Sequence, residues 1–222
     1  MGRINERGKD MEKDYTHVIW DFNGTLYDDV EAGIRSANRL LCAHGLREFL
    51  SVEEYRRTFG FPIIDYYRRM GFDFEKTPYD TLAKEWVPYY MEASKEATVY
   101  PDAVPLLDLF FKKGLTQILL SATELDMLTG QLNRLGIYGE FREVIGLDNI
   151  HARSKKAQAL AWKERNPHAR PLFIGDTLHD ADVAAAVGGD CVLFCGGHQS
   201  RDRLAVTGYP VISDIREIVN YL

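Results

Sequence analysis

The sequence predicts an α/β fold, a doubly wound parallel sheet with an inserted all-helical cap domain. Three observations predict it. Short apolar runs recur along the chain, several of them end at a polar residue, and helical patterns lie between them. The runs are continuous rather than alternating, which is typical of parallel strands buried on both faces. Strands that alternate with helices build a sheet whose two faces are covered by helices.

Polar residues follow three of the expected strands. In a doubly wound sheet, ligands bind at the carboxyl ends of the strands, so these polar residues are candidates for a site. The strands and the residues after them are 17–20 with Asp21, 117–120 with Ser121, and 172–174 with Gly175 and Asp176. Two further strands are expected at Cys191–Phe194 and Val211–Ile212.

Helical patterns separate the later strands. Residues 103–113 and 124–135 carry apolar residues at helical spacing, and each segment is followed by a glycine, the usual residue at a helix C-terminus. A last helix is expected to start at Asp214, because Glu217 stands three positions later in a capping-box pattern.

Residues 30–96 interrupt this alternation. Helical patterns are expected at 30–44, from Ser51 onward, at 61–70 and at 78–95. This block follows the first strand directly, so it is an insertion at the edge where ligands bind, and such an insertion can act as a lid. The expected domains are a flexible N-terminus (1–14), an α/β core (15–29 and 97–222) and a helical cap (30–96).

Composition narrows the class of protein. The 222-residue chain has 27 Lys and Arg against 33 Asp and Glu, a formal net charge of −6, which argues against nucleic-acid binding. No apolar stretch approaches the roughly 18 residues of a membrane span, and residues 1–14 lack the apolar segment of a secretion signal. Three cysteines are too few for a disulfide scaffold. We therefore expect a cytoplasmic protein, with no prediction of its oligomeric state.

The residues after the strands are those that phosphate chemistry needs. A carboxylate can act as a nucleophile, and Gly24 permits a turn that presents amide hydrogens to an anion. A serine can donate to a phosphate oxygen, a lysine can offset the negative charge of the substrate, and paired carboxylates form the oxygen site that Mg²⁺ prefers. The residues concerned are Asp21, Ser121, a lysine at 155 or 156, Asp176 and Asp180.

Four segments resemble motifs of the haloacid-dehalogenase-like hydrolase superfamily. They are Asp21-Phe-Asn-Gly-Thr-Leu26, Leu119-Leu-Ser-Ala-Thr123, Ser154-Lys155 and Phe173-Ile-Gly-Asp-Thr-Leu-His-Asp180. The resemblance spans residues 18 to about 215, and the helical insertion is similar to the cap of phosphoglycolate-phosphatase-like members. It implies a Rossmann-like core and a Mg²⁺-dependent phosphatase that acts on a small phosphorylated metabolite.

The resemblance also implies a role for each matching residue. Asp21 would be the nucleophile that forms an aspartyl-phosphate, Ser121 would hold the phosphoryl oxygens, and Lys155 would orient Asp21. Lys155 is preferred to Lys156 because it follows Ser154, which is expected to cap the next helix. Backbone groups of Asn23, Gly24, Thr25 and Ala122 would contact the phosphate. Mg²⁺ would be held by Asp21, the main-chain carbonyl of Asn23, Asp176 and, directly or through water, Asp180.

One position departs from the family pattern. Most phosphatases of this superfamily have a second aspartate two residues after the nucleophile, which acts as general acid and base, and this chain has Asn23 there. An amide cannot donate a proton and remain as a carboxylate. The sequence therefore predicts a weak phosphatase or one that favours good leaving groups, such as acyl or aryl phosphates. His179 and Asp28 are the nearby candidates for a substitute proton donor.

Two alternatives stay open. Dehalogenases of the superfamily also lack the second aspartate, attack carbon and need no metal, although Asp176 and the absence of an arginine soon after Leu26 argue against this reading. A protein that only binds phosphate or metal is the other alternative.

Other conspicuous side chains have no assigned role. Arg56 and Arg57 are expected to be solvated, the tyrosines at 66, 67, 89 and 90 are expected to pack within the cap, and His198 has no expected partner.

Overall fold

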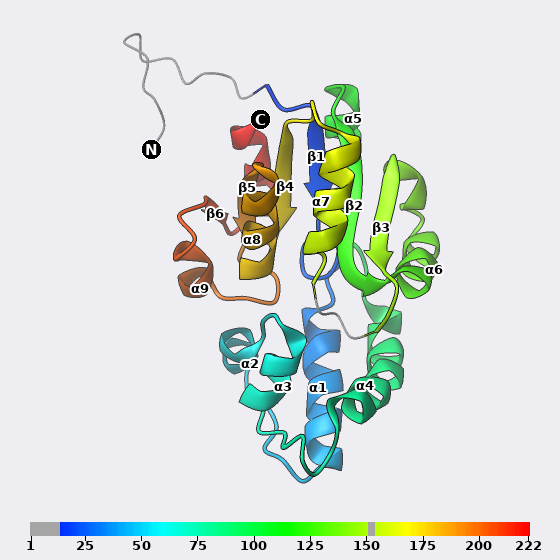
Figure 1. The fold of residues 1–222 in the computed structure, drawn as a ribbon, viewed down its shortest axis with the longest axis vertical. Coiled ribbons are helices and arrows are strands. Elements are labelled where there is room, and N and C mark those ends of the chain that lie inside the picture. Colours follow the sequence, from blue (N-terminus) through cyan, green and yellow to red (C-terminus); the bar gives the residue numbers. More distant parts are fainter. Residues whose placement is uncertain (1–13, 151–153) are drawn as a thin grey trace.

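A computed structural model describes residues 14–150 and 154–222 (Figure 1). Within them, six parallel strands form one sheet in the order β3-β2-β1-β4-β5-β6. The chain order reverses beside β1, which places the switch point of the doubly wound topology between β1 and β4. The strands are β1 (His17–Trp20), β2 (Thr116–Glu124), β3 (Glu143–Leu147), β4 (Pro171–Gly175), β5 (Asp190–Phe194) and β6 (Val211–Ile212).

Successive residues of each central strand enter two different cores. Val18 and Trp20 of β1 pack in one apolar cluster, and Ile19 between them packs in the other. A strand alternates its side chains between the two faces of the sheet, so both clusters are buried only when helices cover both faces. This explains the continuous apolar runs in the sequence.

Helices cover the sheet on both sides. Figure 1 shows α7 and α8 on the face toward the viewer. The apolar residues of these two helices join the cluster of Ile19, whereas those of α5, α6 and η3 join the cluster of Trp20. The elements are α5 (Ala103–Lys112), α6 (Leu125–Leu135), η2 (Tyr138–Glu140), α7 (Lys156–Arg165), α8 (Leu178–Val187), α9 (Arg201–Ala205) and η3 (Ile215–Tyr221).

The inserted residues form a helical block of their own, residues 30–96. The block lies beyond the carboxyl ends of the strands (Figure 1) and has a separate apolar cluster that includes Leu40, Tyr55 and Leu82. Its elements are α1 (Val30–Ala43), α2 (Val52–Thr58), α3 (Ile63–Arg69), α4 (Tyr79–Ala93) and η1 (Ser94–Glu96). Ser51 caps α2 as expected, since its hydroxyl accepts from Glu54 N at 3.1 Å.

The doubly wound fold with a helical insertion is confirmed, and three details differ from the expectation. β2 continues past Leu120 to Glu124, with a register shift against β3 between these residues, so Ser121 lies in an irregular strand end. β3 was not predicted, because this short edge strand is mostly half-buried and lacks an apolar run. The last helix is a 3₁₀ helix, with the expected capping box of Asp214 and Glu217.

Some expectations are not tested by the structure. The proposed flexible N-terminus lies outside the described residues except for residue 14. The domain boundaries remain predictions. Among the described residues, no helix combines the length and the apolar composition that crossing a membrane would require.

A buried glutamine connects the first two strands with α5. Gln117 Oε1 accepts from Trp20 Nε1 at 3.0 Å, and its Nε2 donates to Leu107 O at 2.9 Å. We expect Gln117→Leu to lower the free energy of unfolding by about 1–3 kcal/mol, because the indole N–H is left buried without an acceptor. Urea denaturation measures this. In the same experiment Trp20→Phe should cost less in the Gln117→Leu background than in the wild type, and additive effects would contradict the proposed contact.

Candidate active site

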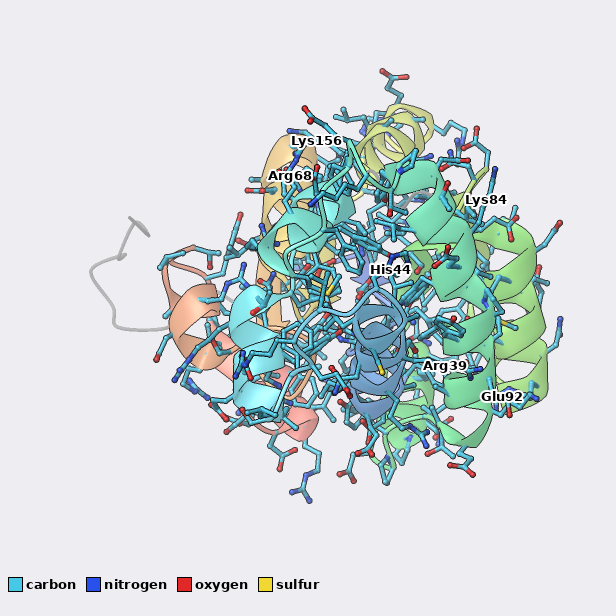
Figure 2. The ribbon with its side chains drawn as sticks, turned by 90° about the horizontal axis from the view of Figure 1, so that it is seen from below. Arg39, His44, Arg68, Lys84, Glu92 and Lys156 are labelled. Carbon is cyan, nitrogen blue, oxygen red and sulfur yellow. The ribbon has the colours of Figure 1, made fainter. Side chains whose placement is uncertain are left out.

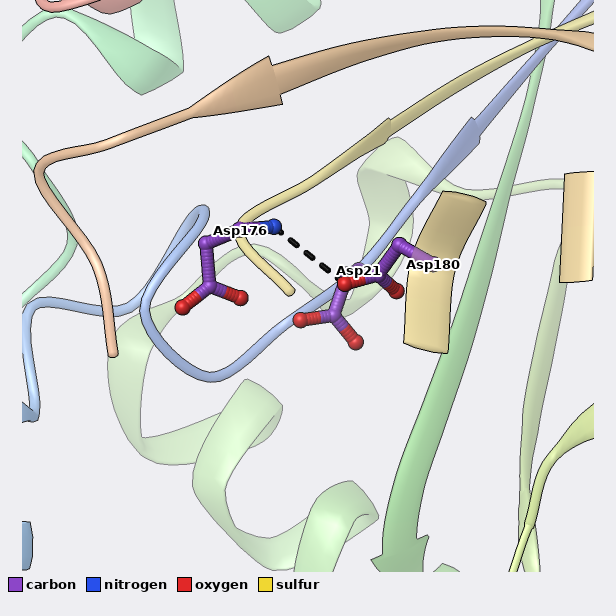
Figure 3. A group of neighbouring side chains, drawn as sticks. All are labelled: Asp21, Asp176 and Asp180. Atoms are coloured by element: carbon purple, nitrogen blue, oxygen red, sulfur yellow. Dashed lines mark hydrogen bonds between the residues drawn. The ribbon is translucent and has the colours of Figure 1, made fainter. Parts of the chain in front are cut away.

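Two carboxylates lie at the ends of adjacent central strands. Asp21 follows β1 and Asp176 follows β4, and Asp21 N donates to Ile174 O at 2.8 Å, which continues the pairing of the two strands. Asp180 comes from the first turn of α8 (Figure 3). One carboxylate oxygen from each of the three residues lies within 4.8 Å of the other two. The sheet therefore brings together carboxylates that are up to 159 residues apart in sequence.

Asp180 is held in place by its own helix N-terminus. Its Oδ2 accepts from Asp176 N at 3.2 Å (Figure 3), Thr177 N at 3.0 Å and Thr177 Oγ1 at 2.6 Å. A Cβ at Gly175 would collide with the Asp180 side chain, so a glycine is needed at the end of β4. The other oxygen, Oδ1, lies 2.7 Å from Lys155 Nζ.

Lys155 is the buried cation of the site. Its ammonium donates to Asp21 Oδ1 and to Leu120 O, the latter at 2.9 Å, and pairs with Asp180. Each of the three N–H groups of the Lys155 ammonium thus has an acceptor. Ser154 Oγ accepts from Lys156 N at 3.1 Å, but the N-cap position of α7 is occupied by Lys155 rather than by Ser154 as expected, and Lys156 itself is exposed. Lys155, and not Lys156, therefore contacts the carboxylates.

The pKa values of the three carboxylates are shifted in different directions. Burial raises the pKa of Asp21 to about 6, although the Lys155 ammonium opposes the rise. Burial raises the pKa of Asp176 well above its usual range. Burial acts in the same direction on Asp180, but Lys155 outweighs it and the pKa of Asp180 is lowered. Burial alone would lower the pKa of Lys155, but Asp180 and Asp21 raise it. Negative charge on Asp21 and Asp176 is therefore incompletely compensated by the protein.

The turn after Asp21 is tight and internally bonded. Gly24 has a φ of +71°, and a Cβ there would collide with Asp176 and His198. Gly24 N donates to Tyr27 O at 2.9 Å and to Asp29 Oδ1 at 2.9 Å. Thr25 N donates to Phe22 O at 3.2 Å. In this structure the turn and Asp29 use the Gly24 and Thr25 amides, and the expected contact of these two residues with a phosphate stays a prediction.

Ser121 and Ala122 both line the cavity beside Asp21. Ser121 is buried, and its hydroxyl donates to Thr123 Oγ1 and accepts from Thr123 N, both at 3.1 Å. Thr123 Oγ1 donates in turn to Asn23 Oδ1 at 2.7 Å. The irregular end of β2 therefore connects Ser121, through Thr123, to Asn23, the residue at which the first motif differs from the family pattern.

Asn23 is oriented by three side chains. Its Nδ2 donates to Asp29 Oδ2 at 2.8 Å and to Tyr90 OH at 2.7 Å, while its Oδ1 accepts from Thr123. Tyr90 OH also donates to Asp29 Oδ2 at 2.6 Å. A carboxylate only accepts hydrogen bonds, so the amide group is the partner that Asp29 requires at this position.

Asp29 belongs to a second buried charge pair, with His198. His198 Nε2 lies 3.2 Å from Asp29 Oδ1, and Tyr55 OH lies 2.8 Å from His198 Nδ1. Burial acts to lower the pKa of His198, but Asp29 outweighs it and raises the pKa to about 9. Burial acts to raise the pKa of Asp29, but His198, Tyr90 and Asn23 lower it. His198 N donates to Asp176 Oδ2 at 2.5 Å, so this pair is joined to the cation site.

The sequence did not identify Asp29, His198 or Tyr90 as part of this network. From the sequence, Asp28 rather than Asp29 was a candidate, Tyr90 was expected to pack within the cap and His198 had no expected partner, because no local pattern shows which of these side chains meet. Arg56 is not solvated as expected, because it donates to Gly197 O at 2.7 Å and Gly196 O at 2.5 Å.

Neither candidate for a substitute proton donor is favoured by the geometry. His179 Nε2 accepts from Lys155 N at 3.3 Å, and its ring stacks on Phe61 at 4.7 Å. Burial lowers the pKa of His179 to about 4, so the ring is neutral near pH 7. Asp28 is exposed. Neither is among the described residues that line the cavity.

Comparisons with known proteins agree with this geometry. A family profile of haloacid dehalogenase-like hydrolases matches residues 18–194. The chain belongs to this family. It is therefore a hydrolase, and the resemblance of its four motifs to this superfamily is confirmed.

The curated relatives include phosphoglycolate phosphatases. That of Pseudomonas putida is 28% identical over 213 residues, which cover 91% of this chain and 78% of the relative. That of Pseudomonas fluorescens is 27% identical, with the same coverage.

The names of solved structures with the same fold describe more than one activity. A phosphoglycolate phosphatase candidate of Lactobacillus delbrueckii subsp. bulgaricus superposes with a TM-score of 0.78 at 18% identity, covering 94% of this chain and 98% of that one. Protein Tyrosine Kinase A of Mycobacterium tuberculosis superposes with a TM-score of 0.77 at 21% identity, covering 94% and 98%. At these identities the likeness shows the fold alone.

The residues present fit a divalent cation. The donor set of Asp21, Asp176 and Asp180 offers only carboxylate oxygens, which are ligands that hard cations prefer. Burial raises the pKa values of Asp21 and Asp176 even though Lys155 lies beside Asp21 and His198 N donates to Asp176, so a bound cation would further stabilise their ionised forms.

Protons and a divalent cation should compete for this site. We expect the affinity for Mg²⁺ to fall at least about fourfold from pH 7.5 to pH 5.5, because Asp21 takes up a proton as the pH falls through about 6. Isothermal titration calorimetry of the metal-free protein with Mg²⁺ measures this. An affinity independent of pH would contradict a site built on these carboxylates, and Asp182→Asn, an exposed change on the same helix, is the control.

Proposed function

We propose that this hydrolase is a Mg²⁺-dependent phosphatase that acts on a small soluble phosphate ester through an aspartyl-phosphate at Asp21. The observation that carries the proposal is the position of Asp21. Its carboxylate lies at the floor of a cavity, beside the Lys155 ammonium and within 4.8 Å of Asp176 and Asp180 oxygens. The similarity to phosphoglycolate phosphatases supports phosphorus rather than carbon as the centre attacked.

Asp21 is suited to attack phosphorus. Lys155 holds one carboxylate oxygen by a hydrogen bond, which orients the other toward the substrate. In the first step the new Asp21 O–P bond forms while the bond from phosphorus to the leaving oxygen breaks. Water then cleaves the aspartyl-phosphate, which releases phosphate and restores the carboxylate. Catalysis of phosphoryl transfer consists largely of such positioning and charge stabilisation.

Ser121 and Lys155 stabilise the transferring group in this proposal. The Ser121 hydroxyl can turn from Thr123 toward a phosphoryl oxygen, since it already lines the cavity. The Lys155 charge lies beside the attacked phosphorus, and its three hydrogen bonds keep it there without rearrangement during the reaction.

Mg²⁺ is the cation proposed for the carboxylate site. Asp21, Asp176 and the main-chain carbonyl of Asn23 would hold it, with Asp180 as a further ligand, directly or through water. When bound, the ion would neutralise charge on the phosphoryl oxygens. Asp180 is better suited to support than to direct contact, because one of its oxygens accepts three hydrogen bonds and the other pairs with Lys155.

A small phosphorylated metabolite is the proposed partner and the cytoplasm the proposed compartment. The free state of Cys42, Cys191 and Cys195 is consistent with a reducing environment.

Replacement of the nucleophile tests the proposal. We expect Asp21→Asn to lower the hydrolysis of p-nitrophenyl phosphate in Mg²⁺ at least about 10³-fold, because the amide cannot attack phosphorus. The exposed Asp182→Asn is the matched control and should keep wild-type turnover.

Three outcomes would contradict the proposal. Full activity of Asp21→Asn would exclude this nucleophile. Activity that persists in EDTA would favour a metal-independent enzyme of the dehalogenase type. No hydrolysis of any phosphate ester by either the wild type or Asp21→Asn would favour a protein that only binds phosphate or metal.

The identity of residue 23 should control the leaving groups that the enzyme accepts. We expect Asn23→Asp to raise turnover on alkyl phosphates at least about tenfold, because general acid catalysis contributes about 10²–10⁴-fold. In this variant two carboxylates would face each other across the present 2.8 Å contact with Asp29, so one of them would hold a proton.

A double variant separates general acid catalysis by residue 23 from the repulsion between carboxylates at positions 23 and 29. Asn23→Asp with Asp29→Asn exchanges the two groups and keeps one carboxylate and one amide in the pair. Steady-state kinetics with an alkyl phosphate compares both variants with the wild type. Unchanged or lower turnover in both would mean that another group already supplies the proton.

A further inference from the structure

The cavity at the active site has two chemically different walls. The floor, from the α/β core, carries the charged groups, whereas the helical block contributes aromatic and aliphatic side chains. The cavity has a volume of about 130 Å³, and its lining joins the charged floor to the apolar wall. The lining residues from the block include Phe59, Phe61, Ile63, Tyr67, Trp86 and Val87.

The basic residues of the helical block point elsewhere. Among the described lining residues, none from this block is a lysine or an arginine. Arg39, Arg68 and Lys84 can be followed in Figure 2, which views the block from the side away from the sheet. Arg68 and Lys84 pair with Asp65 and Asp80 on the surface, and Arg39 lies over the Tyr89 ring at 4.3 Å. Arg56 is bonded to the Gly196 and Gly197 carbonyls.

The cations on the floor are already paired. Lys155 lies between Asp21 and Asp180, and His198 pairs with Asp29. Among the lining residues that the structure describes, the other charged side chain outside these pairs and Asp176 is Glu124, which is itself negative. A carboxylate on the leaving group would therefore meet no unpaired cation among the described residues of the helical block and the floor, and burying an unpaired charge is strongly unfavourable.

Aromatic rings hold the apolar wall in one shape. Trp86 stacks on Tyr90 with 4.6 Å between ring centroids, and Tyr90 is bonded to Asn23. Tyr66 is buried, and its hydroxyl has no hydrogen-bond partner among the described residues. This hydroxyl can bond one neutral polar atom of a ligand, but it cannot neutralise an anion.

We propose that the natural substrate is the phosphate ester of an uncharged aromatic hydroxyl compound, and not phosphoglycolate. The proposal rests on the proposed phosphatase function and names its substrate class. The ring would lie against Trp86, Val87 and Ile63 while the phosphate reaches Asp21.

The identity of residue 23 agrees with this class. When the Asp21 O–P bond forms, the bond from phosphorus to the phenolic oxygen breaks, and the aryloxide leaves with the electron pair. An aryloxide is stable enough to leave without a proton from the enzyme, which suits Asn23.

Two substrates with equally poor leaving groups test whether the apolar wall prefers an uncharged leaving group, because their reactivity at phosphorus is similar. Benzyl phosphate and phosphoglycolate both release an unactivated primary alkoxide, and only the latter carries a carboxylate. We expect kcat/KM to be at least about tenfold higher for benzyl phosphate in Mg²⁺. Equal or higher kcat/KM for phosphoglycolate would overturn the proposal.

A new charge on the wall provides the second measurement. Val87→Lys should lower the ratio of kcat/KM for benzyl phosphate to that for phosphoglycolate at least about tenfold, relative to Val87→Met, which has similar length and no charge. An unchanged ratio would overturn the proposal, because it would show that the leaving group does not contact this wall.

Failure of the phosphatase function itself looks different. In that case neither p-nitrophenyl phosphate nor acetyl phosphate is hydrolysed faster by the wild type than by Asp21→Asn. Hydrolysis of these two compounds together with a preference for phosphoglycolate would retain the phosphatase and reject the aromatic substrate class.

Discussion

Compensation of buried negative charge is the constraint on which this structure depends. Asp21, Asp29, Asp176 and Asp180 are all buried at one edge of the sheet, and Lys155 and His198 are the cations beside them. Burying an unpaired carboxylate is costly, so each of these groups must be hydrogen-bonded, paired or protonated. Cationic partners lower the pKa values of Asp29 and Asp180. Burial raises the pKa values of Asp21, despite Lys155, and of Asp176. These four carboxylates outnumber the two cations by two, and the proposed divalent cation would balance that difference.

The same constraint explains the departure from the family pattern at position 23. Because Asp29 is ionised and buried, the group facing it must donate hydrogen bonds, and the Asn23 amide does so at 2.8 Å. An aspartate there would add a fifth carboxylate to the cluster. The amide at position 23 is thus connected to the pairing of Asp29 with His198 through the hydrogen bond between Asn23 and Asp29.

The helical block is joined to the core through the same groups. Tyr55 of α2 contacts His198, Tyr90 of α4 contacts Asp29 and Asn23, and Arg56 binds the carbonyls of the loop before His198. Aromatic residues of the block and Asp21 line the same cavity. The polar contacts between block and core therefore position the surface that would meet the leaving group in the proposed reaction.

The sequence by itself determined the fold class and the candidate residues at the strand ends. Continuous apolar runs ending at Asp21 and Asp176 suffice for this, because parallel strands bring their carboxyl ends to one edge. The short edge strand β3 and the irregular end of β2 were not predictable, since both depend on pairing between strands rather than on local pattern.

Tertiary structure alone decided which side chains complete the site. Lys155 and Lys156 are neighbours in sequence, and only the packing of α7 shows that one is buried and the other exposed. Asp29 and His198 are 169 residues apart, and no local signal pairs them. The absence of a block cation among the described cavity-lining residues was equally hidden, because a composition rich in arginine does not show which way the arginines point. Local periodicity determines which elements form, whereas long-range contacts determine where each charge finds its partner.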